Sequence, residues 1–171
     1  AGANAAAVVL LTSGGAVAHK QGHNAGHASA TRTTASSAAH VVGSPIQVGN
    51  EPTGIDGTAS VLWVANFGGS TVTRVTPNGK IRTDIQLQRA PFAVLKIGGT
   101  FWVSSADAGV VTPISVATGL PGKPIQVGGK PEWMSGDEDA VYVSNAASDT
   151  VSVVNPRTDQ VIGPPIKVGA V

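Results

Sequence analysis

The residues of this sequence best suited to chemistry are four histidines near its start. His19, His23 and His27 are spaced by four residues, and His40 follows them. On an α-helix this spacing would align three imidazoles on one face, an arrangement that can bind a divalent metal ion. Glycines interleave the histidines, however, and no acidic side chain is near. We therefore expect an unstructured histidine-containing linker and no metal site.

The acidic residues do not suggest a catalytic pair. The consecutive residues Asp137, Glu138 and Asp139 could hold a cation, but they fall where a hairpin is expected, so a solvated turn is the better interpretation. No pair of acids is spaced to act as general acid and base, and residues 41–171 contain no histidine to serve as a base. We expect no catalytic residues and no cofactor. The remaining aspartates considered are single residues at turns or strand edges: Asp56, Asp84, Asp107 and Asp149.

The composition of the 171-residue chain is typical of one domain of short strands and tight turns. Lysine and arginine total 11 and aspartate and glutamate 10, so the net charge is +1 and no nucleic-acid surface is expected. Only 12% of the residues are charged, whereas there are 22 glycines and 11 prolines. Cysteine is absent, which excludes disulfides and thiolate metal sites.

The segment Ile46–Gly49, with the sequence Ile-Gln-Val-Gly, begins a repeat. Related segments start at Ile85, Ile125 and Ile166, which sets a period of about 40 residues. Such a period indicates one supersecondary unit copied several times, in which no copy buries its own apolar face. Other residues recur at equivalent positions with the same period: Pro52, Pro91 and Pro131; Trp63, Trp102 and Tyr142; Val72, Val111 and Val151.

Each copy contains signals for four short antiparallel strands. β-Branched and aromatic residues lie between turns rich in glycine, asparagine and aspartate, and no convincing helical period runs through the copies. Four strands in about 40 residues form the blade of a β-propeller, so we predict an all-β fold with blades at about 50–88, 89–128 and 129–168. The predicted strands are 53–56, 61–66, 71–75 and 80–87; 92–97, 100–105, 110–115 and 123–127; and 132–135, 140–145, 150–154 and 160–168.

The second strand of each copy carries a family resemblance. Tyr142-Val143-Ser144-Asn145 resembles the Tyr-Val-Thr-Asn signature of the YVTN-type, YncE-like propeller repeats. Trp63-Val64-Ala65-Asn66 matches it with Trp for Tyr, and Trp102-Val103-Ser104-Ser105 loses the final Asn. The resemblance covers residues 42–171 and implies propeller blades without a particular activity. The similar streptogramin lyases rely on His and Glu with magnesium, and residues 41–171 lack the histidine.

The repeated residues have structural interpretations. We expect the aromatic residues at 63, 102 and 142 to fill the space between neighbouring blades, because a ligand platform seldom has three equal copies. Asn66 and Asn145 are expected to close a turn, since Asn tolerates unusual φ and bonds its own backbone. The prolines at 52, 91 and 131 are expected to begin the innermost strand of each blade, where no ladder donor is needed.

Three blades are too few to close a ring, since propellers have about 4 to 8. A leading outer strand is expected at residues 41–48, and Pro165–Val171 begins a further copy. We therefore expect an incomplete ring that is closed either by further blades or by association of chains. We expect the chain to be a fragment or a processed form.

The expected binding surface is the propeller face where the loops entering the innermost strands meet those joining the second and third strands. Their mixed charge suits a protein surface or another polar ligand. We predict a non-catalytic binding or sensor module; the alternative is part of a propeller hydrolase or lyase whose catalytic residues lie in other blades. The candidate binding residues are Asn50, Glu51, Phe67, Arg89, Asp107, Lys130 and Asp149.

Residues 1–40 contain none of the residues that recur in the repeats. Ala5–Leu11 is an apolar run, shorter than the roughly 20 residues that span a membrane, and Ala16-Val17-Ala18 has the form of a signal cleavage site without a charged leader. The Ala-, Ser- and Thr-rich remainder is expected to be a disordered linker. We expect an extracytoplasmic module, secreted or tethered to the membrane; a flexible tail without a targeting role is the alternative.

Overall fold

The computed structural model describes residues 43–87 and 89–169. The expectations for residues 1–40, including the histidine-containing linker and the export or anchor segment, lie outside the described residues. Within the described ranges, no helix has the length and apolar character needed to cross a membrane.

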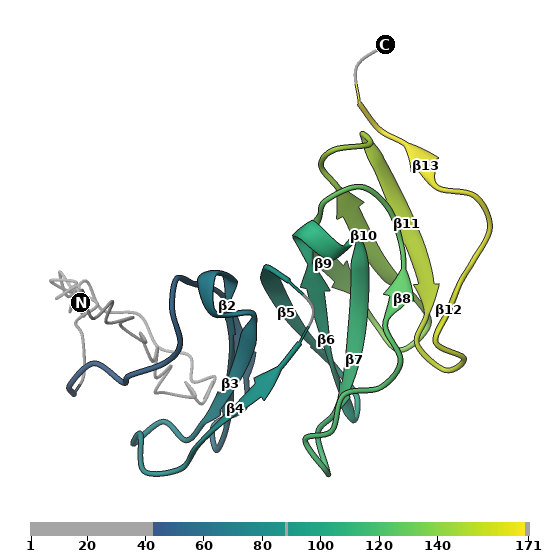
Figure 1. Cartoon of the computed structure of the whole chain (residues 1–171). Coiled ribbons are helices and arrows are strands. Elements are labelled where there is room, and N and C mark those ends of the chain that lie inside the picture. Colours follow the sequence, from purple (N-terminus) through teal and green to yellow (C-terminus); the bar gives the residue numbers. More distant parts are fainter. Residues whose placement is uncertain (1–42, 88, 170–171) are drawn as a thin grey trace, which may run out of the picture. The chain divides into compact units, whose positions relative to one another are not determined.

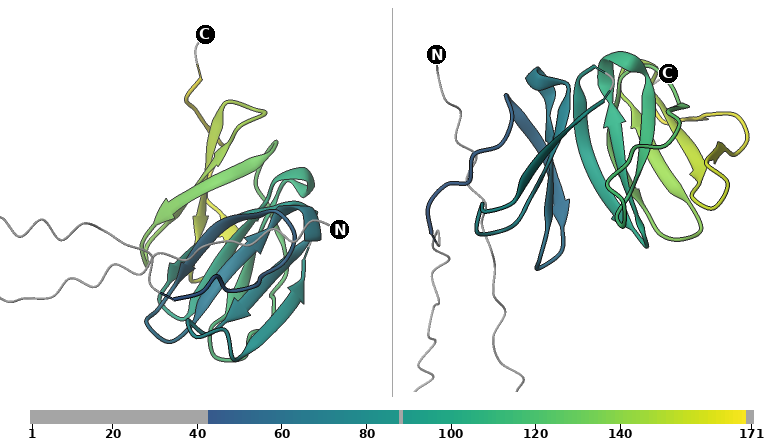
Figure 2. Two further views of the ribbon diagram at one scale, coloured as in Figure 1. Left: turned by 90° about the vertical axis from the view of Figure 1, so that its left-hand side faces the viewer. Right: turned by 60° about the horizontal axis from the view of Figure 1, so that its bottom comes forward.

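The described strands form three antiparallel sheets, which we call blades 1, 2 and 3 (Figure 1). Neighbouring strands in a sheet follow one another in the chain, except that β13 pairs with β11, and each sheet is visibly twisted (Figure 2). Blade 1 contains β1 (Pro52–Gly57), β2 (Leu62–Asn66), β3 (Thr71–Val75) and β4 (Arg82–Gln86). Blade 2 contains β5 (Pro91–Ile97), β6 (Thr100–Ser105), β7 (Val110–Ser115) and β8 (Ile125–Gln126). Blade 3 contains β9 (Pro131–Gly136), β10 (Val141–Asn145), β11 (Thr150–Asn155), β12 (Gln160–Val161) and β13 (Ile166–Lys167). The 3-10 turns η1 (Phe67–Gly69) and η2 (Ala106–Ala108) precede β3 and β7.

This architecture confirms the predicted fold class, an all-β array of four-stranded propeller blades in an incomplete ring. The prolines at 52, 91 and 131 begin the innermost strands, as predicted. The strands predicted at 71–75, 100–105 and 110–115 have those bounds.

The outer strands differ most from the prediction. The single strand predicted at 160–168 is wrong, because β12 and β13 are separated by residues that include Pro164 and Pro165. Proline has no backbone N–H to donate and therefore interrupts a ladder. The strands predicted at 80–87 and 123–127 shorten to β4 and β8. In the described part of the leading strand predicted at 41–48, only Ile46 has β-bridge character.

Successive side chains of a strand point to opposite faces of its sheet, and in this protein both faces carry apolar residues. We call the face that packs against the following blade the far face and the opposite one the near face. The far faces contain Trp63, Ala65 and Val72 in blade 1, Trp102, Ser104 and Val111 in blade 2, and Tyr142, Ser144 and Val151 in blade 3. The near faces contain Val64 and Val75 in blade 1, Phe101, Val103 and Ile114 in blade 2, and Val141, Val143 and Val154 in blade 3.

The far face of one blade packs on the near face of the next, and an aromatic side chain lies in each contact. Trp63 is fully buried, and its ring stacks on Phe101 of blade 2 at a centroid distance of 4.8 Å. Trp102 is fully buried in the apolar cluster that joins blades 2 and 3. These two residues fill the space between blades, as predicted. Tyr142, the third of these recurring aromatic residues, is 47% exposed because no described blade follows it.

Hydrogen bonds repeat across the two contacts between blades. The Thr53 hydroxyl donates to the Phe92 carbonyl at 2.7 Å, and the Ser104 hydroxyl donates to the Glu132 carbonyl at 2.6 Å. Both carbonyls belong to the residue after the proline of an innermost strand. Hydroxyl groups of β1 and β6 therefore hold the innermost strand of the following blade in place, in addition to apolar packing.

The role predicted for Asn66 is wrong. Its φ of −114° is extended, and its side chain makes no capping hydrogen bond to η1. The side chain is fully buried, with Nδ2 donating to the hydroxyls of Thr71 at 3.1 Å and Thr73 at 2.9 Å, and Oδ1 accepting from the Gly49 N–H at 3.1 Å. Asn66 thus ties the segment that leads into the blade to the third strand.

Asn145 departs from its predicted turn role in the same way. Its Nδ2 donates to Thr150 at 3.1 Å and to Ser152 at 3.0 Å. The residue packed against this amide is Gly128, where a Cβ would lie only 2.6 Å from Asn145 Cγ. The glycine of the Ile-x-Val-Gly segment is therefore required by the asparagine it faces.

Gly128→Ala should destabilise the protein by roughly 1–3 kcal/mol, because the added methyl overlaps the buried Asn145 side chain. Denaturant unfolding measures this loss. In an Asn145→Ser background the same substitution should cost much less, since the overlapping amide is gone, giving a coupling energy of about 1 kcal/mol or more. An equal cost in both backgrounds would contradict this explanation of the glycine.

Candidate functional site

At one end of each blade, the loop that enters the innermost strand lies beside the loop that joins the second and third strands. We call these loops the rim (residues 49–51, 67–70, 89–90, 106–109, 128–130 and 146–149). An equivalent hydrogen bond joins the two loops in each of the three blades. The backbone N–H of the first residue of the loop between the second and third strands donates to a carbonyl of the entry loop. The bonds are Phe67 N–H to Glu51 O at 2.9 Å, Ala106 N–H to Ala90 O at 2.9 Å, and Ala146 N–H to Lys130 O at 3.0 Å.

Several rim residues adopt the left-handed backbone conformation. Glu51, Ala90 and Lys130 have φ values of 50°, 53° and 56°, and each immediately precedes a proline. Ser70 and Asp149, which precede third strands, have φ values of 52° and 49°. This conformation costs about 1–2 kcal/mol for a residue with a Cβ, and glycine would avoid that cost. The surrounding hydrogen bonds hold the rim backbone in this strained form.

The structure brings together three of the seven predicted binding residues on blade 1. The half-buried Phe67 begins η1, and the exposed Asn50 and Glu51 lie against the following Gly68. A Cβ at Gly68 would come within 2.7 Å of Asn50 Nδ2 and 2.9 Å of Glu51 Oε2. The amide of Asn50 and the carboxylate of Glu51 therefore lie against the exposed backbone of Gly68, which follows Phe67 in the chain.

The other four predicted residues are exposed on the rims of blades 2 and 3. Asp107 lies in the first turn of η2, and Arg89 precedes Ala90. Lys130 forms an ion pair with Glu132 at 3.1 Å. Within residues 43–87 and 89–169, no hydrogen bond or ion pair joins the side chains of Arg89, Asp107 or Asp149 to another of the seven residues. The structure thus places this set along a surface and does not gather it into one pocket.

A row of aromatic rings beside the rim was missed in the sequence. Phe67 contacts Phe92 edge to face at a centroid distance of 6.3 Å, and Phe92 contacts Trp133 in the same way at 5.3 Å. Trp133 is 60% exposed. Phe92 and Trp133 follow the prolines that begin β5 and β9 by one and two residues, where the pairing register of each strand shifts. The signal available in the sequence was an aromatic residue within two positions after the repeated proline in the second and third copies.

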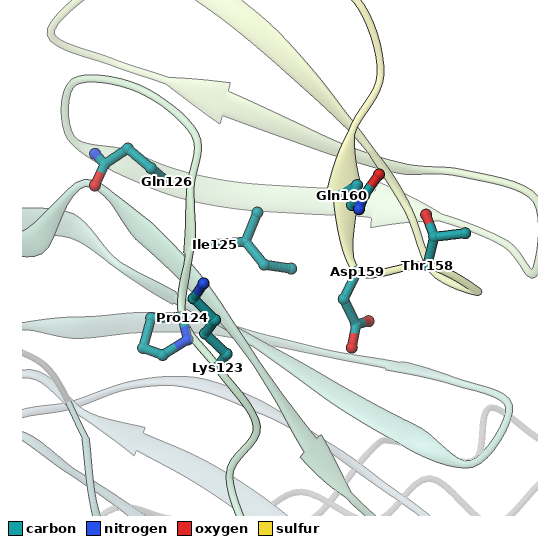
Figure 3. Close-up of a pocket in the computed structure, with 7 residues that line it drawn as sticks. All are labelled: Lys123, Pro124, Ile125, Gln126, Thr158, Asp159 and Gln160. Atoms are coloured by element: carbon teal, nitrogen blue, oxygen red, sulfur yellow. The ribbon is translucent and has the colours of Figure 1, made fainter.

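A groove of about 490 Å³ lies between the outer strand of blade 2 and the turn before β12 (Figure 3). Lys123 and Asp159 contribute opposite charges from its two walls, and Ile125 lines it between them (Figure 3). None of the seven predicted residues lines this groove.

The acidic residues 137–139 form a solvated turn between β9 and β10, as expected. The Asp137 carboxylate accepts the N–H groups of Asp139 at 2.9 Å and Ala140 at 3.2 Å, and Arg157 pairs with the exposed Asp139. In the part of the chain that the structure describes, no group of three or more His, Cys, Asp or Glu residues could hold a metal ion.

No protein-family model and no curated protein matches the chain. Among solved structures it is similar to Kuenenia stuttgartiensis hydrazine synthase, with 19% identity, a TM-score of 0.57, and coverage of 65% of this chain and 34% of that one. It is similar to Citrobacter koseri AztD, with 15% identity, a TM-score of 0.57, and coverage of 78% and 38%. It is also similar to the dihydro-heme d1 dehydrogenase NirN, with 14% identity, a TM-score of 0.61, and coverage of 78% and 32%.

These similarities support the fold. The solved structures are β-propellers, which agrees with the bladed architecture, and the chain spans 32–38% of the length of the three proteins named. The specific resemblance to YVTN-type repeats stays a prediction.

Asp137 should titrate below its ordinary pKa of 3.8, because the N–H groups of Asp139 and then Ala140 stabilise the carboxylate. The stabilisation is fully present above the pKa of the unfolded chain and is lost as the pH falls through the lowered pKa of the folded state. An NMR titration of the carboxyl carbon measures the midpoint. A midpoint at or above the ordinary value would contradict the turn geometry. Asp137→Asn keeps the acceptor oxygen and should remove the titration.

Proposed function

We propose that this chain is a non-catalytic binding module of YVTN type that recognises a polar segment of another protein with its rim. The observation that supports this most directly is the identity of the strained residues. Glu51, Lys130 and Asp149 are charged residues in a left-handed conformation that glycine would adopt without strain. Strained backbone conformations that the surrounding structure maintains cluster at ligand-binding and catalytic sites.

The chemistry of the rim suits such a ligand. Carboxylates and an ammonium group offer charge-assisted hydrogen bonds of either polarity, and the aromatic row of Phe67, Phe92 and Trp133 offers flat apolar contact beside them. The hydrogen bonds between paired loops keep these groups in place before binding, which reduces the entropy lost on association. We place the module outside the cytoplasm, secreted or tethered to the membrane through residues 1–40, on the evidence of the signal-like sequence alone.

The test compares glycine substitutions at strained positions on and off the rim. Peptides are selected from a random phage-displayed library on the wild-type chain, and their affinities are measured by calorimetry. The triple variant Glu51→Gly, Lys130→Gly, Asp149→Gly should bind them at least about tenfold more weakly, because it loses charge-assisted contacts. Its stability should be unchanged or raised, by up to about 1 kcal/mol per substitution, because backbone strain is relieved.

Two matched controls separate strain from recognition. Asp159→Gly removes a charged residue with φ 56° that lies outside the rim, and Ser70→Gly removes an uncharged residue with φ 52° within it. Both variants should bind the selected peptides like the wild type. Peptides that bind the triple variant as tightly as the wild type would contradict the proposal.

A further inference from the structure

The far face of blade 3 is uncovered, although the equivalent faces of blades 1 and 2 are buried. Tyr142 is 47% exposed, whereas Trp102 at the same repeat position is fully buried. Ile166 is 51% exposed, whereas the equivalent Ile125 is 9% exposed. The contacts between blades 1 and 2 and between blades 2 and 3 show what covers such a face, namely the near face of another blade.

The outer strands of blades 1 and 2 share a specific hydrogen bond. Gln86 in β4 donates its side-chain N–H to the carbonyl of Ser70 at 2.8 Å. Gln126 in β8 donates in the same way to the carbonyl of Gly109, also at 2.8 Å. Both acceptors are left-handed rim residues that precede a third strand. The glutamine of the Ile-Gln-x segment is therefore the residue that anchors an outer strand to its own blade.

Blade 3 lacks this anchor. Lys167 occupies the glutamine position, since it pairs with Thr150 as Gln86 pairs with Thr71. The acceptor equivalent to Ser70 is the Asp149 carbonyl. It receives the backbone N–H of Val168 at 3.0 Å, as Ser70 receives that of Leu87 and Gly109 that of Val127, so blade 3 lacks only the side-chain hydrogen bond. All residues from 157 to 169 are exposed. The outer strand of blade 3 is thus the least secured of the three.

The missing glutamine is present at the other end of the described chain. Ile46–Gly49 has the sequence of an outer strand, with Gln47 at the anchoring position, but it precedes the innermost strand of blade 1. Val48 is 8% exposed and packs with Val64 and Val75 on the near face of blade 1. Val127, which follows β8, packs in the same way on the near face of blade 3. Ile46–Gly49 is therefore placed as the outer strand of a blade that would precede blade 1.

We propose that a second copy of this chain completes blade 3. The second copy's Ile46–Gly49 takes the position of Ile166–Gly169 beside β11, and its Gln47 side chain donates to the Asp149 carbonyl. The near face of the second copy's blade 1 then covers Tyr142. Leu62 of the second copy lies against Tyr142 in the way that Phe101 lies against Trp63 between blades 1 and 2. The contact is reciprocal, so two copies exchange outer strands in a closed, two-fold symmetric dimer.

The number of blades favours this occupant. With three described blades in each copy, two copies make a ring of six, which falls within the range of known propellers. The far face of blade 3 and the near face of blade 1 are also the two kinds of face that meet in the two contacts between blades already present in the structure.

The first test is sedimentation of the full 171-residue chain over a concentration series. We expect a reversible monomer–dimer equilibrium that ends at twice the chain mass. Tyr142→Glu places a charge on the far face and should weaken the dimer at least about tenfold, whereas Leu120→Glu, at a residue 67% exposed in the turn before β8, should not. Circular dichroism confirms that both variants are folded. A chain that stays monomeric, that forms open-ended polymers, or whose dimer is equally weakened by both substitutions would overturn the proposal.

The second test locates the exchanged strand, using the absence of cysteine from the chain. Gln47→Cys and Thr150→Cys chains are mixed and oxidised. Residues paired in antiparallel strands have Cα atoms about 4.5–5.5 Å apart, within disulfide range, so the mixture should form a cross-linked heterodimer. Cross-linking no greater than in a mixture of Leu120→Cys and Thr150→Cys would overturn the exchange.

The third test uses the anchoring residue itself. Lys167→Gln gives blade 3 its own anchor, so the dimer should dissociate at concentrations at least several-fold higher than for the wild type, while the thermal stability of the monomer does not fall. Lys167→Ala serves as the matched control for loss of the lysine, and it should leave the dimer unchanged. Equal effects of the two substitutions would contradict strand exchange.

Discussion

Every sheet of this protein carries apolar side chains on both faces, so each must be covered on both sides. An isolated four-stranded sheet could bury neither Trp63 nor Trp102, yet both are fully buried once neighbouring blades meet. Burying a side chain of this size is worth roughly 1.5–3 kcal/mol or more, which is a large share of the stability of a small domain. Stability is therefore a property of the contacts between blades, and Tyr142 shows the consequence where a contact is missing.

The rim depends on these contacts but is free to vary in its side chains. Buried asparagines of blades 1 and 3 bond to the third strand, Asn66 also accepts the N–H of Gly49 in the entry loop, and each asparagine requires a glycine opposite it. In blade 2 the asparagine is replaced by Ser105, and the sequence has Gln88 where the other copies have Gly49 and Gly128. With the shorter serine in place, the reason for a glycine disappears. The hydroxyls of Ser105 and Thr112 are left buried without a hydrogen-bond partner within the described residues.

The fold could be predicted from the sequence because the weak local signals for strands and turns recur at equivalent positions in each copy. Strands such as β3 and β7 have the predicted bounds since alternation and turn residues agree there. The role of Asn66 could not be inferred, because recurrence shows that a residue is needed but not which groups it contacts. The contact between Phe92 and Trp133 also escaped prediction, since they lie one and two residues after their prolines and the strand register shifts in both segments, so the repeat alignment does not pair them. The seven binding residues are located but remain a prediction.

Acrylamide quenching of tryptophan fluorescence tests most directly whether the blades stabilise one another through buried aromatic contacts. Two variants retain a single tryptophan, Trp63 or Trp102, with the others replaced by phenylalanine. We expect both tryptophans to be shielded in the folded protein and to become quenchable together in one cooperative thermal transition. Free quenching of either residue at low temperature, or two separate transitions, would contradict the account.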